Sequence, residues 1–74
     1  MQVTVKLFAS FRNKWFDEAV RECPHGAEVI DIVKEIGIPA NELGIVLVNG
    51  RHASLHDKLQ DGDVVSVMPL IGGG

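Results

Sequence analysis

The last residues of the chain, Met68 to Gly74, read MPLIGGG and contain its clearest candidate for chemistry. Three consecutive glycines form a backbone without Cβ atoms, which fits a channel too narrow for other residues. Extended at about 3.3–3.6 Å per residue, residues 70–74 would reach roughly 17 Å beyond a folded domain. The reactive group of such an arm is the α-carboxylate of Gly74, which is ionised at neutral pH and therefore a poor electrophile.

This carboxylate must be activated from outside before a nucleophile can attack it. Coupling to AMP, with ATP as the donor, would form a mixed anhydride, and a sulfur nucleophile could then displace the nucleotide to leave a thiocarboxylate. We therefore expect Gly74 to be the reacting residue. Contacts with a partner are expected from the residues that lead to it, which are Gly73, Gly72, Ile71, Leu70 and Pro69. The alternative to a functional tail is that the three glycines are a frayed terminus or a cloning remnant.

Other residues that could do chemistry have weaker patterns. His52 and His56 are four apart, but His52 follows the Asn49-Gly50 turn and no third ligand has suitable spacing, so we expect surface histidines and no metal site. Cys23 is the only cysteine and is expected to pack at the end of a strand. The carboxylates are expected to form a solvated acidic surface; they are Asp17, Glu18, Glu22, Asp57, Asp61 and Asp63.

Length and composition narrow the classes of function. The chain has 74 residues, 46% of them apolar, and a net charge of −3. It is long enough for one small domain and too short to enclose a substrate, which argues against an independent enzyme. The acidic charge argues against nucleic acid and anionic membranes as partners. No signal peptide or apolar span is visible, so we expect a cytoplasmic protein. We also expect that the chain binds no cofactor itself.

The first half of the sequence predicts a hairpin followed by a helix. Residues 1–8 alternate between apolar and polar, as a half-buried strand does, and residues 17–23 offer a second strand after a turn at Asn13-Lys14. From Glu28 the period changes. Apolar residues at 29, 32, 33 and 36 form the stripe of an amphipathic helix, which Gly37 and Pro39 should end.

The second half predicts two more strands. The apolar run 45–48 is expected to be a strand buried on both faces near the centre of the sheet, and Leu55 and Leu59 are expected to lie on a short turn of helix. Asp61-Gly62-Asp63 forms a turn into a last strand, 64–69, in which Val65 and Val67 share a face.

The resulting fold class is α+β: a small mixed sheet with one main helix packed across one face. The domain should span residues 1–69, with 70–74 as a flexible tail that ends in Gly-Gly. The face of the sheet that the helix leaves open, with Phe8 or Lys6 on it, should remain available for a partner.

Several stretches resemble the ubiquitin-like sulfur carriers of the MoaD and ThiS family. They are VKLFASFR at the start, VNGR in the middle and LQDGDVVSVMPLIGGG at the end. The resemblance covers essentially the whole chain and implies the ubiquitin-like β-grasp fold. It also implies that a ubiquitin-activating-type adenylyltransferase (MoeB/ThiF-like) uses ATP and a metal ion to adenylate Gly74, which is then converted to a thiocarboxylate.

The start of the chain, KLFASFR, is similar to that of the small subunit of molybdopterin synthase. This implies that the tail is inserted into the large subunit and gives sulfur to a pterin precursor. Other sulfur-accepting enzymes stay open as partners, including those of thiamin thiazole, tungsten cofactor and cysteine synthesis. A ubiquitin-like modifier that is conjugated to lysines and an interaction module with an inert tail are further alternatives.

Overall fold

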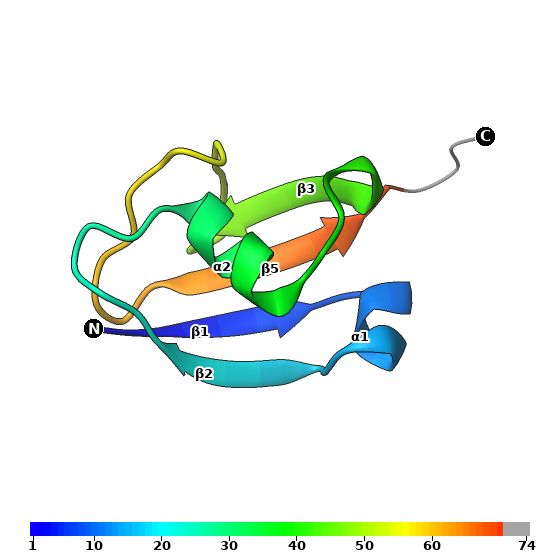
Figure 1. Cartoon of the computed structure of the whole chain (residues 1–74), viewed down its shortest axis with the longest axis horizontal. Helices are drawn as coiled ribbons and strands as arrows, with labels where there is room; N and C mark the ends of the chain where they lie inside the picture. Colours follow the sequence, from blue (N-terminus) through cyan, green and yellow to red (C-terminus); the bar gives the residue numbers. More distant parts are fainter. Residues whose placement is uncertain (71–74) are drawn as a thin grey trace.

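The computed structural model describes residues 1–70 and shows one mixed sheet of five strands. The strands are β1 (Gln2–Leu7), β2 (Glu18–Glu22), β3 (Leu43–Val48), β4 (Arg51–His52) and β5 (Val64–Pro69). Their order across the sheet is β2-β1-β5-β3-β4. Strands β1 and β5 are parallel and every other pair is antiparallel. The central strand is therefore β5, the one that leads directly to the C-terminal residues (Figure 1).

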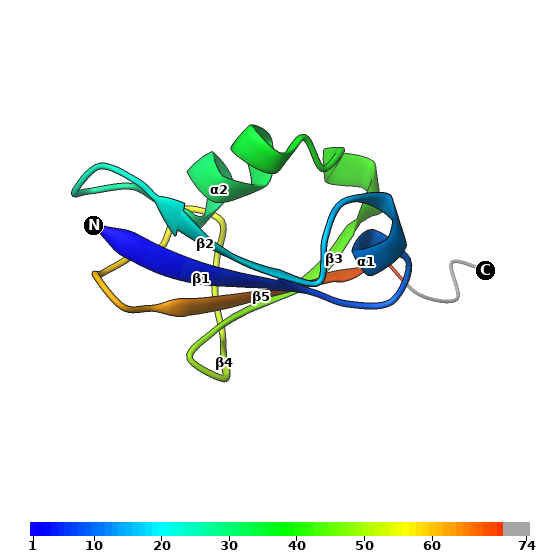
Figure 2. The same cartoon turned by 90° about the horizontal axis from the view of Figure 1, so that it is seen from below.

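The helices lie on one side of this sheet. They are α1 (Ser10–Lys14), the main helix α2 (Val29–Ile36) and the short 3-10 helix η1 (Ala40–Glu42). In Figure 2 the sheet is seen nearly edge-on, with α2 above it and the β3–β4 turn below it. The prediction of a small mixed sheet with one main helix across one face is confirmed.

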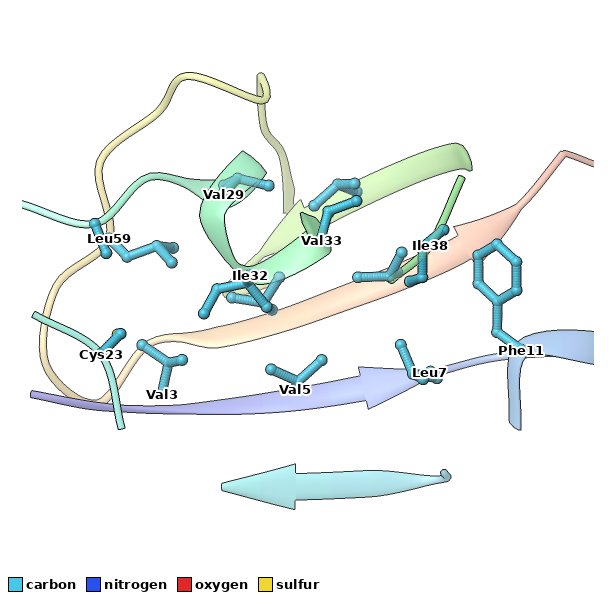
Figure 3. Packing of buried hydrophobic residues seen from close by; sticks show 14 residues of the cluster. Val3, Val5, Leu7, Phe11, Cys23, Val29, Ile32, Val33, Ile38 and Leu59 are labelled. Carbon is cyan, nitrogen blue, oxygen red and sulfur yellow. The ribbon is translucent and has the colours of Figure 1, made fainter. Parts of the chain in front are cut away.

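The core forms between α2 and the face of the sheet that it covers. Val3, Val5 and Leu7 alternate along β1 and are at most 1% exposed. They meet the apolar stripe of α2, as Figure 3 shows for Val29, Ile32 and Val33. Among the described residues, no polar or charged side chain is buried. Burial of this apolar surface is the main force that holds the helix on the sheet.

Helix α2 begins and ends as its sequence predicts. At its start the Glu28 backbone N–H donates to Asp31 Oδ2 at 2.8 Å. The N–H groups of Val29 and Ile30 donate to the carbonyls of Asp57 and Leu55, so the chain around residues 55–57 satisfies the first turn. At its end Gly37 takes a left-handed conformation with φ 95°, which residues with a Cβ adopt only at a cost.

Three details of the sequence prediction are wrong, and one element was missed. The segment around Asn13-Lys14 is not a simple turn but the end of α1, whose Phe11 is 1% exposed and packs in the core. The run Leu55 to Leu59 forms turns and a bridge rather than a turn of helix. Strand β3 lies next to the central strand, as predicted, but it is not buried on both faces, since only Val46 is buried along it. Helix η1 was not predicted.

Candidate functional site

The candidate site lies where the chain leaves the end of β5. Pro69 is the last residue of the strand and pairs with Leu43 of β3. The Leu70 backbone N–H donates to the carbonyl of Glu42 in η1 at 2.9 Å, while its side chain is 61% exposed. The backbone is thus held as far as residue 70. The other predicted site residues lie outside the described residues; they are Ile71, Gly72, Gly73 and Gly74.

A β-bulge in β3 shapes this end of the sheet. From the Leu43–Pro69 pair to the Val46–Val67 pair, β3 advances one residue more than β5 does. Gly44 lies in the bulge. A Cβ on Gly44 would come 2.5 Å from the carbonyl oxygen of Pro69 and 2.8 Å from that of Met68. Glycine is therefore required for the close approach that fixes the last residues of β5.

Sequence analysis missed Gly44, although a glycine between apolar residues of a strand is a known signal. Such a glycine marks a bulge or a place where another backbone comes close. Both features are present here.

An apolar pocket of about 320 Å³ adjoins the same residues. Its lining consists of Gly44, Ile45, Met68, Pro69 and Leu70, none of which carries an ionisable side chain. Ile45 is 46% exposed, because it alternates with the buried Val46 and so lies on the face of the sheet that α2 does not cover. The pocket has the size and lining to take an apolar side chain of a partner, next to the point where the tail begins.

The open face of the sheet carries Phe8 toward the same end. Phe8 is 38% exposed, and its backbone N–H donates to the carbonyl of Val67, so it follows β1 beside the last residues of β5. Lys6 is half-buried on this face and lies across from Ser66 of β5. The open face predicted from the alternation of β1 is confirmed, and with Ile45 and Leu70 it is largely apolar near the tail.

The histidines and Cys23 lie away from this end. His52 is on β4, and His56 Nδ1 lies 2.9 Å from Glu28 Oε1. Within residues 1–70, no three His, Cys, Asp or Glu side chains are grouped in a way that could hold a metal ion. Cys23 is buried in the core, as predicted, and burial raises the pKa of its thiol.

Four of the carboxylates also accept hydrogen bonds, and Glu22 Oε1 accepts from Gln2 Nε2 at 2.8 Å. Asp61 Oδ1 accepts from the backbone N–H of Gln2 at 2.7 Å, and Asp57 Oδ2 accepts from that of Ser54 at 2.9 Å. Asp63 accepts from the backbone N–H of Gln60 and from the side-chain amide of Asn49. The prediction of an acidic surface stands for these groups; in addition, Asp57 and Asp63 each stabilise a turn, and Asp61 ties the turn at residues 60–63 to the start of β1.

No helix in the described part of the chain is long and apolar enough to cross a membrane.

Comparison with known proteins agrees with this architecture. The model of the ThiS family matches residues 5–74. A putative molybdopterin converting factor, subunit 1, from Pyrococcus furiosus is 36% identical and has a TM-score of 0.83, with 96% of this chain and 99% of that chain covered.

Two more distant structures share the fold. SAMP1 from Haloferax volcanii is 22% identical with a TM-score of 0.83, and both chains are covered in full. A complex of subunits 1 and 2 of molybdopterin-converting factor from Helicobacter pylori contains a chain that is 23% identical, with a TM-score of 0.68 and full coverage of both chains. At these identities the likeness establishes the fold alone. The predicted ubiquitin-like β-grasp fold is confirmed.

Proposed function

Because this chain belongs to the ThiS family, we propose that it is a sulfur carrier protein whose Gly74 carboxylate is adenylated and then converted to a thiocarboxylate. The observation that carries the proposal is that the family match runs through the glycine tail to residue 74. The folded part supports it, since Pro69 and Leu70, the last described residues, are held by β3 and η1 at one end of the sheet.

The chemistry of this proposal is supplied by a partner. A ubiquitin-activating-type adenylyltransferase (MoeB/ThiF-like) would use ATP to form the acyl-adenylate and release pyrophosphate. A sulfur nucleophile would then form the new C–S bond as the bond to AMP breaks. In this scheme the chain is a co-substrate rather than an enzyme, and its own contribution is to present an ionised carboxylate on a narrow backbone.

We propose molybdopterin synthesis as the pathway that receives the sulfur. The similarity to the Pyrococcus furiosus protein supports this choice, because that protein is described as a putative molybdopterin converting factor subunit. The partner would be the large subunit of molybdopterin synthase. We propose that one of its apolar side chains enters the pocket between Ile45 and Leu70 while the tail extends into its active site.

The test of thiocarboxylate formation uses intact-mass spectrometry. The purified protein is incubated with the activating enzyme, ATP and a sulfide source, and we expect a species in which one oxygen is replaced by sulfur. Deletion of Gly73 and Gly74, which removes the Gly-Gly end, should abolish this species, whereas Lys34→Ala, on the exposed side of α2, should leave it unchanged. Absence of the species with an enzyme that activates a known carrier would contradict the proposal.

The choice of pathway needs a second measurement. The thiocarboxylated protein is added to the large subunit and the pterin precursor, and to a thiazole synthase with its substrates in parallel. Sulfur transfer to the pterin alone is expected. Transfer only to the thiazole would overturn the pathway and leave the carrier function intact. Conjugates of higher mass that vanish on deletion of Gly74 would instead indicate a protein modifier.

The pocket is tested by charge. Ile45→Glu should weaken binding to the large subunit by about tenfold or more, because a carboxylate would have to lose its hydration in an apolar contact. Gln60→Glu adds the same charge at an exposed position outside the pocket and is expected to bind normally. Equal binding by both variants, measured by calorimetry, would exclude the pocket from the interface.

A further inference from the structure

Strand β2 forms one edge of the sheet. It pairs with β1 on one side, and within the described residues no strand lies on its other side. Figure 1 shows β2 in cyan along this edge, at the opposite side of the sheet from β3. An edge of this kind presents unpaired backbone groups that another extended chain can bind.

The pairing of β1 with β2 determines which backbone groups are free. Cys23 and Met1 exchange backbone hydrogen bonds of 2.9 and 2.8 Å, and the Leu7 N–H donates to the carbonyl of Asp17. Because such pairs alternate along an antiparallel ladder, the odd-numbered residues of β2 turn their backbone groups toward β1. Glu18, Val20 and Glu22 therefore turn their N–H and C=O groups outward.

The side chains of the same three residues lie on the open face of the sheet. In the register of the hairpin, Glu18, Val20 and Glu22 lie opposite Lys6, Thr4 and Gln2. All three are exposed, and Val20 is 63% exposed. Arg21 lies on the opposite face of the sheet, where its Nη1 is 2.7 Å from Oε1 of Glu35 in α2.

We propose that the outer edge of β2 binds an extended segment of a partner protein that has the pattern basic–x–aliphatic–x–basic. Backbone groups of the segment would pair with those of Glu18, Val20 and Glu22. Because directly opposite residues lie on the same face, its aliphatic side chain would cover Val20 and its basic side chains would meet the two carboxylates. Glu22 is already oriented, since its Oε1 accepts from Gln2 Nε2 at 2.8 Å.

Charge argues against a second copy of this chain as the occupant. In an antiparallel pair of β2 strands centred on Val20, Glu18 of one copy would lie opposite Glu22 of the other. Like charges in that position are destabilising. Acidic side chains on an edge therefore prevent self-association and still admit a basic segment. The net charge of −3 favours the same class of partner over longer distances.

The first experiment measures binding of a defined peptide by NMR. The probe is the capped peptide TKTVTKT, and the matched control is TETVTET, in which the lysines are replaced by glutamates. We expect TKTVTKT to shift the amide signals of Glu18, Val20 and Glu22 and to slow their hydrogen exchange. The control should bind about tenfold more weakly or not at all, because two attractive pairs become repulsive.

Two variants test the charges and the backbone separately. Glu18→Lys combined with Glu22→Lys should reverse the preference, so that TETVTET binds and TKTVTKT does not. Val20→Pro removes an outward N–H and should therefore abolish binding. The ladder to β1 should remain, since proline is tolerated on such an edge. Val20→Thr keeps the N–H and should bind the peptide detectably.

Three results would overturn the proposal. One is equal binding of the two peptides, and another is a set of shifts confined to residues outside β2. The third is a concentration-dependent shift of β2 signals without peptide, which would indicate pairing between copies. Deletion of Gly74 should leave peptide binding unchanged, so this test fails or succeeds independently of the sulfur-carrier function.

Discussion

At position 9 the backbone has φ 52° and ψ −133°, a conformation that residues with a Cβ adopt at a cost of about 1–3 kcal/mol. Ala9 joins the exposed Phe8 to helix α1, whose Phe11 is buried in the core. The contacts on either side hold this residue in place. The strain is thus offset by the packing of Phe11 and positions Phe8 beside the end of β5.

Ala9→Gly should therefore stabilise the protein. Glycine adopts this conformation without strain but loses more entropy on folding, and the balance is expected to be about 1 kcal/mol in favour of the variant. Urea unfolding should show a higher midpoint with an unchanged slope. The control is Ala53→Gly, at a position without positive φ, which should lower the midpoint. A lower midpoint for Ala9→Gly would show that the conformation carries no strain.

Cys23 provides a prediction of pH dependence. Burial disfavours the thiolate and raises the pKa of the thiol, with a further contribution from nearby carboxylates such as Glu35. The folded protein then holds the thiol proton more tightly than the unfolded chain does. Stability from this group is complete below the ordinary thiol pKa and decreases as pH rises through it toward the folded value.

Urea unfolding at about pH 8 and about pH 10 measures this effect, since the ordinary thiol pKa lies between them. The wild type should lose more stability over this range than Cys23→Ala does, and its thiol should react with alkylating reagents far more slowly than in urea. Identical losses for the two proteins would mean that the thiol ionises as freely in the fold as in the unfolded chain.

At the scale of elements, the spacing of apolar residues predicted which faces of α2 and β1 are buried, and the structure confirms both. The stripe of α2 and the alternation of β1 gave their buried faces correctly, because each face meets the core along its whole length. Helix α1 has five residues and one buried side chain, Phe11, which is too little to produce a periodic signal. The run 45–48 indicated full burial, yet only Val46 is buried and Ile45 is exposed, because α2 covers one face of the sheet alone.

Only part of the candidate site could be predicted from the sequence. Residues 69–74 were predicted from the sequence because a glycine tail follows directly after the last predicted strand, and for residues 71–74 this stays a prediction. The pocket and the bulge could not be predicted, because they depend on which strand lies beside β5. That neighbour is β3, and sequence alone did not place Gly44 against the backbone of Pro69.

Gly44→Ala tests the role of the bulge. The added Cβ would lie 2.5 Å from the Pro69 carbonyl oxygen, and a backbone atom in a paired strand cannot move aside as a flexible side chain does. We expect a loss of about 1–3 kcal/mol in unfolding free energy, as for other overpacked sites. The amide signal of Leu70 should also shift, because its hydrogen bond to Glu42 lies at this end of β5.

The matched control for this variant is Ile45→Ala, which changes the next residue of the bulge. Its side chain is 46% exposed, so the loss should be smaller than that of Gly44→Ala. If Gly44→Ala were as stable as the wild type and left the Leu70 signal in place, the close approach of the two strands would not determine where the tail begins.

At the scale of the whole molecule, three regions have separate roles. The core lies between α2 and one face of the sheet, and the fourteen residues buried in it within the described range 1–70 fall between Val3 and Val67 (Figure 3). The pocket and the start of the tail lie at the end of β5, and the free edge of β2 lies along one side of the sheet (Figure 1). Stability and the two proposed interactions should therefore be separable by mutation.

Deletion of residues 71–74 tests this separation. Because the core that residues 1–70 form is built from residues 3–67, we expect the unfolding free energy to change by less than about 0.5 kcal/mol. The truncated protein should also bind the TKTVTKT peptide normally, yet form no acyl-adenylate with the activating enzyme and ATP. Val65→Ala is the converse control. It removes methyl groups from a side chain with 0% exposure and should lower stability by about 1–3 kcal/mol while the adenylation site stays intact.

A truncated protein that unfolds at a markedly lower urea concentration would show that the tail contributes to the fold as well as to the proposed reaction. Retained adenylation after truncation would instead contradict the role of Gly74. With neither result, the proposed division holds, in which residues 1–70 supply the stable fold and the C-terminal carboxylate supplies the reacting group. Strand β5, which precedes the tail, is held on both sides by its hydrogen-bonded ladders to β1 and β3.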